Sequence, residues 1–183
     1  MKNSASLYFA AAQSSAKYRK VRKEELKMIK DLLKPENIHF DVNPGHSKKS
    51  ALKAISKLCG EHYSTIKESA LYKNFVGREK IESTGFGGGI AIPHAKIDNL
   101  TNPFIAIVRF SKPVDWDSID GKSVQVAIAL VMPTVDTDNT HLEVLSHFSR
   151  KLADDEFLNR LLTEPDAVAL YNYIIEQMGE ELK

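Results

Sequence analysis

The segment most suited to chemistry runs from Ser83 to Lys96 and reads Ser-Thr-Gly-Phe-Gly-Gly-Gly-Ile-Ala-Ile-Pro-His-Ala-Lys. Pro93 fixes its own φ, lacks a backbone donor and biases Ile92 toward extended geometry. We therefore expect a short strand to stop at Pro93 and to present His94 at its tip. Neutral imidazole is a good nucleophile near pH 7. The segment predicts a reactive histidine on a rigid element, beside flexible backbone that a bulky anion could approach.

The glycines before this strand are Gly85, Gly87, Gly88 and Gly89. They could form a loop that cradles phosphate, or a tight turn with positive φ, which is the commoner role of glycine. A P-loop requires Gly-Lys-Ser/Thr at the start of a helix, and a dinucleotide fingerprint runs strand, glycines, helix. Here the order is glycines, strand, histidine, so the sequence matches neither nucleotide-binding motif.

His141 is the second candidate. Thr140 and Glu143 fit a capping box, which would place His141 in the first turn of a helix, where unpaired N–H groups favour an anion. We expect it to face inward, because apolar residues follow at helical spacing. His147 lies about 120° farther around the helix and is interpreted as a surface or core residue instead. The apolar residues on the face of His141 are Leu145, Phe148 and Leu152.

Arg78 follows Gly77 at an expected helix end, and its sequence position leaves two interpretations open. It is either a solvated charge favoured by the helix dipole or a guanidinium that pairs with phosphate. A metal held by His94 and His141 is a weaker alternative. The chain has neither a His-Glu-x-x-His pair nor a cysteine cluster, so we predict no metal.

Composition is that of an ordinary globular protein, with 183 residues, 43% hydrophobic and 27% charged. No apolar run approaches the roughly 20 residues of a membrane span, so we expect no membrane insertion. The single cysteine, Cys59, excludes an intrachain disulfide and favours a reducing compartment, the cytoplasm.

Charge separates a basic leader from the rest of the chain. Residues 1–30 carry eight Lys/Arg and two Glu, a net +6, so the remainder of a +1 chain carries −5. We interpret residues 1–28 as a basic N-terminal extension and residues 29–183 as one domain. Five basic residues within 17–23 are weak support for nucleic-acid binding, which we do not predict.

Periodicity and turn signals predict a mixed α/β fold. We expect a mixed sheet covered by helices, an α/β sandwich, with an extra helical leader. The run at 124–132 is apolar nearly throughout, so it should be central and covered on both faces. The expected helices span about 26–33, 47–60, 65–77, 140–153, 155–163 and 165–177, and the expected strands span 38–42, 89–92, 104–110 and 124–132.

Four segments together resemble the IIA domain of the bacterial phosphotransferase system (PTS), of the type 2 or fructose/mannitol kind that includes nitrogen-regulatory IIA proteins. The resemblance covers roughly residues 29–177. Residues 115–121 are most similar to fructose-type domains, whereas 140–152 are also similar to nitrogen-regulatory proteins. The four segments are Arg78-Glu79-Lys80, Ser83-Thr84-Gly85, Gly89-Ile90-Ala91-Ile92-Pro93-His94 and Thr140-His141-Leu142.

The resemblance implies a mixed sheet of about five strands flanked by α-helices. It also implies a phosphohistidine carrier without a cofactor. An HPr-type phosphocarrier would phosphorylate His94, on Nε2, and a IIB domain on a separate chain would take the group for fructose/mannitol-type sugar uptake. His141 and Arg78 would stabilise the phosphoryl group. Phe86 would either support docking of a carrier or pack in the core. The loop expected at the phosphoryl site comprises Thr84, Gly85, Gly87, Gly88 and Gly89.

Two alternatives remain at the level of sequence. In one, the protein is a nitrogen-regulatory IIA-like protein, and the phosphorylation state of His94 controls which partners it binds. In the other, His94 and His141 form a hydrolase site that turns over phosphoesters without a carrier.

Overall fold

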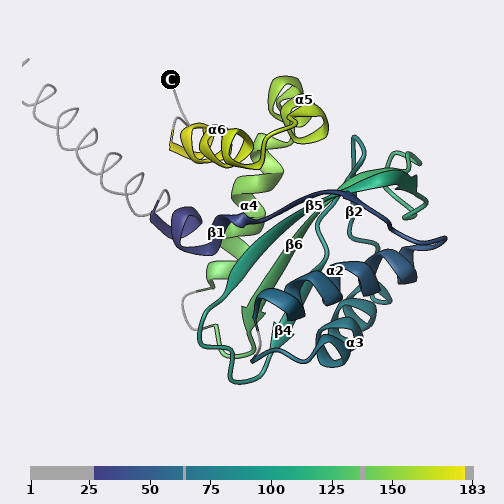
Figure 1. Cartoon of the computed structure of the whole chain (residues 1–183), viewed down its shortest axis with the longest axis vertical. Coiled ribbons are helices and arrows are strands. Elements are labelled where there is room, and N and C mark those ends of the chain that lie inside the picture. The colour runs from purple at the N-terminus through teal and green to yellow at the C-terminus, as the bar shows by residue number, and fades with distance from the viewer. Residues whose placement is uncertain (1–26, 64, 137–138, 180–183) are drawn as a thin grey trace, which may run out of the picture.

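The computed structural model describes residues 27–63, 65–136 and 139–179. Within them, helices cover both faces of one sheet, as expected (Figure 1). A short helical stretch over residues 27–32 precedes the first strand. The strands are β1 (Leu33–Val42), β2 (Gly85–Gly87), β3 (Ile90–Ala91), β4 (His94–Ile97), β5 (Phe104–Val114) and β6 (Val124–Pro133). The helices are α2 (Lys48–His62), α3 (Glu68–Glu79), α4 (Thr140–Lys151), α5 (Asp155–Thr163) and α6 (Ala167–Gly179).

The sheet is mixed and has six strands in the order β1-β5-β6-β3-β2, with β4 also paired to β6. Strand β1 runs parallel to β5, and β5 runs antiparallel to β6. Both β3 and β4 pair in parallel with β6, at Val126–Ala127 and from Leu130 onward. They occupy the same position in the sheet, next to β6, and are separated from each other by Ile92–Pro93. The expected count of about five therefore matches the positions across the sheet.

Strand β6 is central and buried on both faces, which confirms the prediction for 124–132. Its side chains alternate between two apolar layers, as the period of a strand requires. One layer, which includes Ile128 and Leu130, packs with α4, α5 and α6. The other, which includes Ala129 and Val131, packs with α2 and α3. In Figure 1 the two helix groups lie on opposite sides of the sheet. The long strands thus form the rigid centre of the sheet, to which β4 is paired through β6.

The predicted start of α2 is confirmed, because the Ser47 side chain accepts a hydrogen bond from the amide of Ser50. Both expected glycine stops are wrong. Helix α2 continues past Gly60 to His62, and α3 continues past Gly77 to Glu79. A single glycine lowers helix stability by only about 1 kcal/mol relative to alanine, which tertiary packing readily offsets.

The start expected at residue 65 for the next helix is too early. Helix α3 begins after Lys67, and no side chain caps it by hydrogen bonding. Helix α6 begins at Ala167, later than the start expected at 165, because the Asp166 side chain accepts a hydrogen bond from the amide of Ala169.

The first strand begins at Leu33 rather than at Ile38. Residues 1–26 of the basic extension lie outside the described residues, so the division into a leader of residues 1–28 and a domain of 29–183 stays a prediction. Among the helices that the structure describes, none has the length and apolarity to cross a membrane.

Candidate functional site

His94 is the first residue of β4 and lies opposite Leu130 of β6. The Leu130 amide donates a 2.9 Å hydrogen bond to the Pro93 carbonyl, which ties the start of β4 to the sheet. The expectation that His94 projects from the tip of a strand is therefore wrong in detail. Proline does end β3, but the chain resumes pairing with β6 at His94, so the histidine lies at a break within the sheet.

Two hydrogen bonds define the state of the His94 ring. Its Nδ1 lies 3.0 Å from the carbonyl oxygen of Ile92, and its Nε2 lies 2.7 Å from Nε of Arg78. A carbonyl can only accept, so Nδ1 carries the proton and Nε2 has the lone pair that accepts from the guanidinium. The nitrogen beside Arg78 is therefore the nucleophilic one.

The environment of His94 lowers the pKa of its imidazole from the ordinary value of 6.5. Burial is the main cause, and the positive charges of Arg78 and His141 add to it. The Ile92 carbonyl and the Glu79 carboxylate oppose the shift without reversing it. His94 is thus held in the neutral, nucleophilic form near pH 7.

We expect the His94 imidazole to titrate below pH 6.5, so that Nε2 protonates only under acidic conditions. Because a lowered pKa favours the neutral base, the rate of any reaction at Nε2 should stay level as pH falls through neutrality. A ¹⁵N NMR titration of labelled protein would measure this value, with the urea-unfolded chain as the reference. A midpoint at or above that of the unfolded chain would contradict the prediction.

Arg78 lies in the last turn of α3 and is directed at His94. Its Nη1 donates a 2.9 Å hydrogen bond to the carbonyl oxygen of Glu82, so the guanidinium is held at two points. The side chain contacts the histidine ring rather than only solvent, and its pairing with phosphate stays a prediction. A guanidinium in this position is suited to pairing with phosphoryl oxygens.

His141 lies in the first turn of α4, as predicted, but the capping box of Thr140 and Glu143 is wrong. The carboxylate of Asp136 caps the helix instead and accepts from the amides of Thr140 at 2.9 Å and His141 at 3.1 Å. The same carboxylate accepts from Nδ1 of His141.

Asp136 orients His141 and leaves Nε2 as the ring nitrogen for other contacts. The Asp136 side chain is only 6% exposed, and burial raises its pKa. The hydrogen bonds from His141 and Thr140 outweigh burial, so the net pKa is lowered and the group stays a carboxylate. His141 and His94 are close enough to interact electrostatically, so the structure brings both histidines and Arg78 together.

Within the expected phosphoryl-site loop, Thr84 is linked to the histidine through the backbone of Ile92. The Thr84 carbonyl accepts a 2.9 Å hydrogen bond from the amide of Ile92, whose own carbonyl binds the His94 ring. The carbonyl of Gly89 accepts instead from the amide of Val126, at the start of β6. Val126 precedes the partner of His94 by four residues, about 13 Å along a strand.

Gly85, Gly87, Gly88 and Gly89 belong to the β2–β3 hairpin, and their expected place at the phosphoryl group stays a prediction. Three have positive φ, at 113°, 60° and 83° for Gly87, Gly88 and Gly89, which is the turn role of glycine. The Gly88 amide donates to a carboxylate oxygen of Asp120 at 2.8 Å, so it is not directed at His94. A Cβ on Gly85 would lie 2.7 Å from Oγ of Ser118, so that glycine permits close packing.

Residues 31–177 match the family model described as phosphoenolpyruvate-dependent sugar phosphotransferase system, EIIA 2. The match covers most of the chain and includes every residue of the site above. The chain belongs to this family. The boundaries agree with the resemblance expected over about 29–177, and the fold found here is that of the family's IIA domains.

Curated relatives of this EIIA 2 chain include both kinds named by the sequence resemblance. The nitrogen regulatory protein of Pseudomonas aeruginosa is 36% identical over 148 residues, which cover 81% of this chain and 95% of that protein. The fructose-specific EIIABC component of Bacillus subtilis is 39% identical over 104 residues, which cover 56% of this chain and 16% of that protein.

A solved structure agrees with the fold. The crystal structure of the nitrogen regulatory protein IIA-Ntr from Neisseria meningitidis superposes with a TM-score of 0.70 at 28% identity, over 80% of this chain and 96% of that one. The IIA mannitol structure from Escherichia coli gives a TM-score of 0.62 at 17% identity, over 80% of this chain and 98% of that one, and supports the fold alone.

Two acidic side chains at this candidate site are not identified by the sequence pattern. Asp136 caps α4 from four residues before the helix, outside the usual capping positions. Glu79 stands in the sequence only as the neighbour of Arg78. Its carboxylate contacts the backbone and side-chain oxygens of the segment that follows α3. The available signal was a carboxylate at the C-terminal end of a helix, where the dipole disfavours negative charge.

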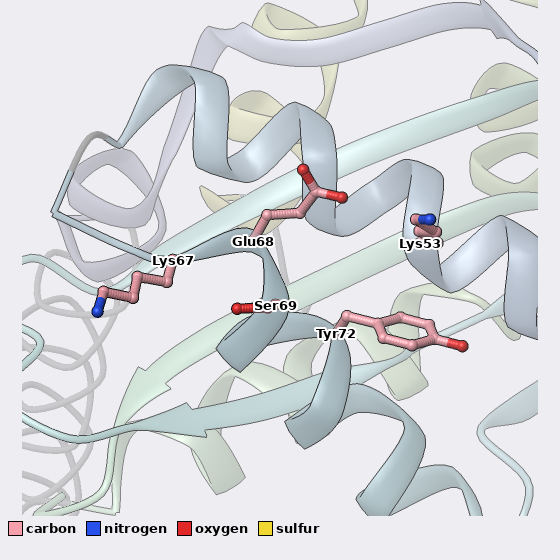
Figure 2. A pocket seen from close by; sticks show the side chains of 5 residues that line it. All are labelled: Lys53, Lys67, Glu68, Ser69 and Tyr72. Atoms are coloured by element: carbon pink, nitrogen blue, oxygen red, sulfur yellow. The ribbon is translucent and has the colours of Figure 1, made fainter.

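A separate surface hollow of about 740 Å³ lies between α2 and α3. Figure 2 shows Lys53 and Lys67 at opposite ends of it, with Glu68 between them in the view. Such spacing does not concentrate positive charge at one point, and none of the predicted site residues lines the hollow. In the part of the chain that the structure describes, there is no group of three or more His, Cys, Asp or Glu side chains that could hold a metal ion.

Proposed function

We propose that this chain is a cytoplasmic phosphohistidine carrier that accepts a phosphoryl group on Nε2 of His94 from an HPr-type phosphocarrier. The observation that carries the proposal is the hydrogen bond from Nδ1 of His94 to the Ile92 carbonyl. It places the ring proton away from Arg78 and leaves a lone pair where a phosphoryl group could be stabilised. This is the requirement for attack by the Nε2 atom.

The transfer needs only one bond to form and one to break. The lone pair of Nε2 forms a P–N bond while the bond from phosphorus to the donor nitrogen breaks and returns its electron pair to the donor. Because Nε2 carries no proton, no base is required. The protein has to supply position and charge stabilisation, which dominate phosphoryl transfer. In this proposal Arg78 and His141 supply the charge.

A carrier must dock around the histidine, and exposed apolar side chains support such a surface. Ile81 and Leu142 are 80% and 55% exposed, and each follows a candidate site residue within three positions. Phe86 packs against the core instead, which supports the alternative that the sequence left open for it.

Other family structures and proteins support the choice of partners. The NMR structure of a complex of IIA-mannitol with phosphorylated IIB-mannitol from Escherichia coli has a TM-score of 0.60 to this chain. A multiphosphoryl transfer protein of Shigella flexneri is 34% identical over 145 residues, which cover 78% of this chain. We propose that a IIB domain on a separate chain accepts the group from His94, in fructose/mannitol-type sugar uptake.

A regulatory role is the second candidate, and the relatives favour it. Six of the relatives are named nitrogen regulatory proteins or homologues, including one from Pseudomonas aeruginosa at 36% identity. In that role the same phosphorylation of His94 would change the binding of other proteins. The hydrolase alternative has less support, because family members in both roles are named for phosphoryl transfer or regulation.

A reconstituted transfer reaction tests the proposal and separates the two roles. With phosphoenolpyruvate, enzyme I and an HPr-type protein, the chain should gain one acid-labile phosphoryl group, seen by mass spectrometry and assigned to Nε2 by ³¹P NMR. The phosphorylated chain is then mixed with isolated IIB domains. Transfer to a IIB domain supports the sugar carrier, whereas retention with altered partner binding supports regulation. Failure to gain the group would overturn both.

A further inference from the structure

Glu79 is a buried carboxylate at an electrostatically unfavourable place. It is the last residue of α3, where the helix dipole disfavours negative charge, and its side chain is only 6% exposed. Burial of a charge is costly unless hydrogen bonds and opposite charge compensate for it. The position therefore requires a compensating network, and the structure contains one.

Both carboxylate oxygens of Glu79 are used. Oε1 accepts from the amide of Thr84 at 3.1 Å and from Oγ of Ser83 at 3.2 Å, while Oε2 accepts from Oγ1 of Thr84 at 2.5 Å. The ammonium group of Lys48 lies 3.2 Å from Oε1. Through these hydrogen bonds the carboxylate holds the end of α3 to residue 84 and fixes the turn between them.

The closed turn supplies the two carbonyls that hold the site. The Glu82 carbonyl accepts from Nη1 of Arg78 at 2.9 Å. The Thr84 carbonyl accepts from the amide of Ile92, and the Ile92 carbonyl in turn accepts from Nδ1 of His94. Arg78 and the proton of His94 are therefore both positioned by the segment that Glu79 fixes.

Lys48 connects this turn to α2 and to the chain before β6. Its Nζ donates to the carbonyl of Trp116 at 3.1 Å and contacts Asp117 at 2.9 Å, in addition to Glu79. Burial lowers the pKa of Lys48, but the hydrogen bonds to Asp117 and Glu79 outweigh it, so the net pKa is raised and the ammonium stays charged. The buried carboxylate is thereby neutralised from a second element.

We propose that Glu79 is a positioning residue, which fixes His94 in the tautomer with the proton on Nδ1 and holds Arg78 against Nε2. Its effect on phosphoryl transfer rests on the function proposed above, whereas its effect on the tautomer does not. Replacing the carboxylate by an amide of the same size puts an NH₂ group against the donors of Thr84, Ser83 and Lys48. The turn should then loosen without loss of a core side chain.

The test compares Glu79→Gln with Glu68→Gln, a matched change at an exposed side chain at the other end of α3. In ¹⁵N NMR of the full chain, wild type and Glu68→Gln should show one His94 tautomer, protonated on Nδ1. Glu79→Gln should show both tautomers in exchange. Phosphoryl transfer from the HPr-type protein should slow about 10- to 100-fold, the range for carboxylates that orient functional histidines in metal sites.

An unchanged tautomer in folded Glu79→Gln would overturn the proposal, even if transfer were slow, because a merely structural role would lower stability without moving the ring proton. If Glu79→Gln does not fold, Glu79→Asp keeps the charge and shortens the reach, and it should show the same mixture to a smaller degree. A wild type that takes up no phosphoryl group would refute the proposed function, while the tautomer comparison would still decide the role of Glu79.

Discussion

Replacement of His94 by alanine is expected to abolish uptake of the phosphoryl group by this protein. The imidazole supplies the only atom to which the proposal attaches phosphorus, so the loss should be complete rather than partial. The fold should survive, because the half-buried ring lies at a break in the sheet and contributes two side-chain hydrogen bonds. Mass spectrometry after incubation with phosphoenolpyruvate, enzyme I and an HPr-type protein measures the result.

A matched histidine variant shows whether the effect is specific. His46 is exposed in the turn before α2, so His46→Ala should be phosphorylated at the wild-type rate. Amide NMR spectra of both variants check that each is folded. A phosphoryl group on folded His94→Ala would place the acceptor elsewhere and refute the assignment of Nε2.

The second large effect is expected for Arg78→Ala, which should slow phosphoryl transfer about 10²- to 10³-fold, as for the loss of one donor that stabilises a transition state. The guanidinium is held 2.7 Å from Nε2, the atom that would receive the phosphoryl group, so it could stabilise the negative charge on the phosphoryl oxygens during transfer. Rapid-quench kinetics with the phosphorylated donor in excess would measure the rate. Because the charge of Arg78 lowers the pKa of His94, the same variant should also raise that pKa toward its ordinary value.

Arg160 provides the control for Arg78. It lies in α5 and donates a hydrogen bond to Glu164. Arg160→Ala therefore also removes a hydrogen-bonded arginine side chain from a helix, but from a different helix than Arg78. That variant should leave both the transfer rate and the pKa of His94 unchanged. An Arg78→Ala protein that transfers at the wild-type rate would show that the contact with Nε2 has no part in the reaction.

Much of the sheet was predictable because its strands have simple patterns. The run at 124–132 is apolar nearly throughout. This pattern is typical of a strand covered on both faces, and β6 is such a strand. The helix starts that depend on a side chain were predicted less well. Ser47 does cap α2, but the expected cap from Thr140 is replaced by Asp136, which reaches back from before the helix.

The break at Ile92–Pro93 could be predicted only in part. Proline shows that the strand stops, but the chain's return to β6 at His94 depends on long-range pairing with Leu130. The positions of the glycines depend on long-range pairing in the same way. The Gly89 carbonyl accepts from the amide of Val126, whereas His94 lies opposite Leu130.

His94, Arg78 and His141 were named together through the resemblance, and the structure brings them together. Their spacing along the sequence does not show that they lie close together, because α3, β4 and α4 meet only in the folded chain. The supporting carboxylates of Asp136 and Glu79 were not identified, since each acts through hydrogen bonds to backbone and side chain that a sequence pattern does not encode.

The hydrogen bond between Arg78 and Nε2 of His94 also affects the thermodynamics of a phosphorylated state. A phosphoryl group on Nε2 must displace that bond, which for a charged donor is worth about 1.5–3 kcal/mol. The free energy that the guanidinium would gain by pairing with phosphoryl oxygens is therefore partly offset by the loss of its hydrogen bond to the ring. In the proposed carrier, this offset would keep the group-transfer potential of the phosphohistidine high, so that the group could be passed on and the transfer would be reversible.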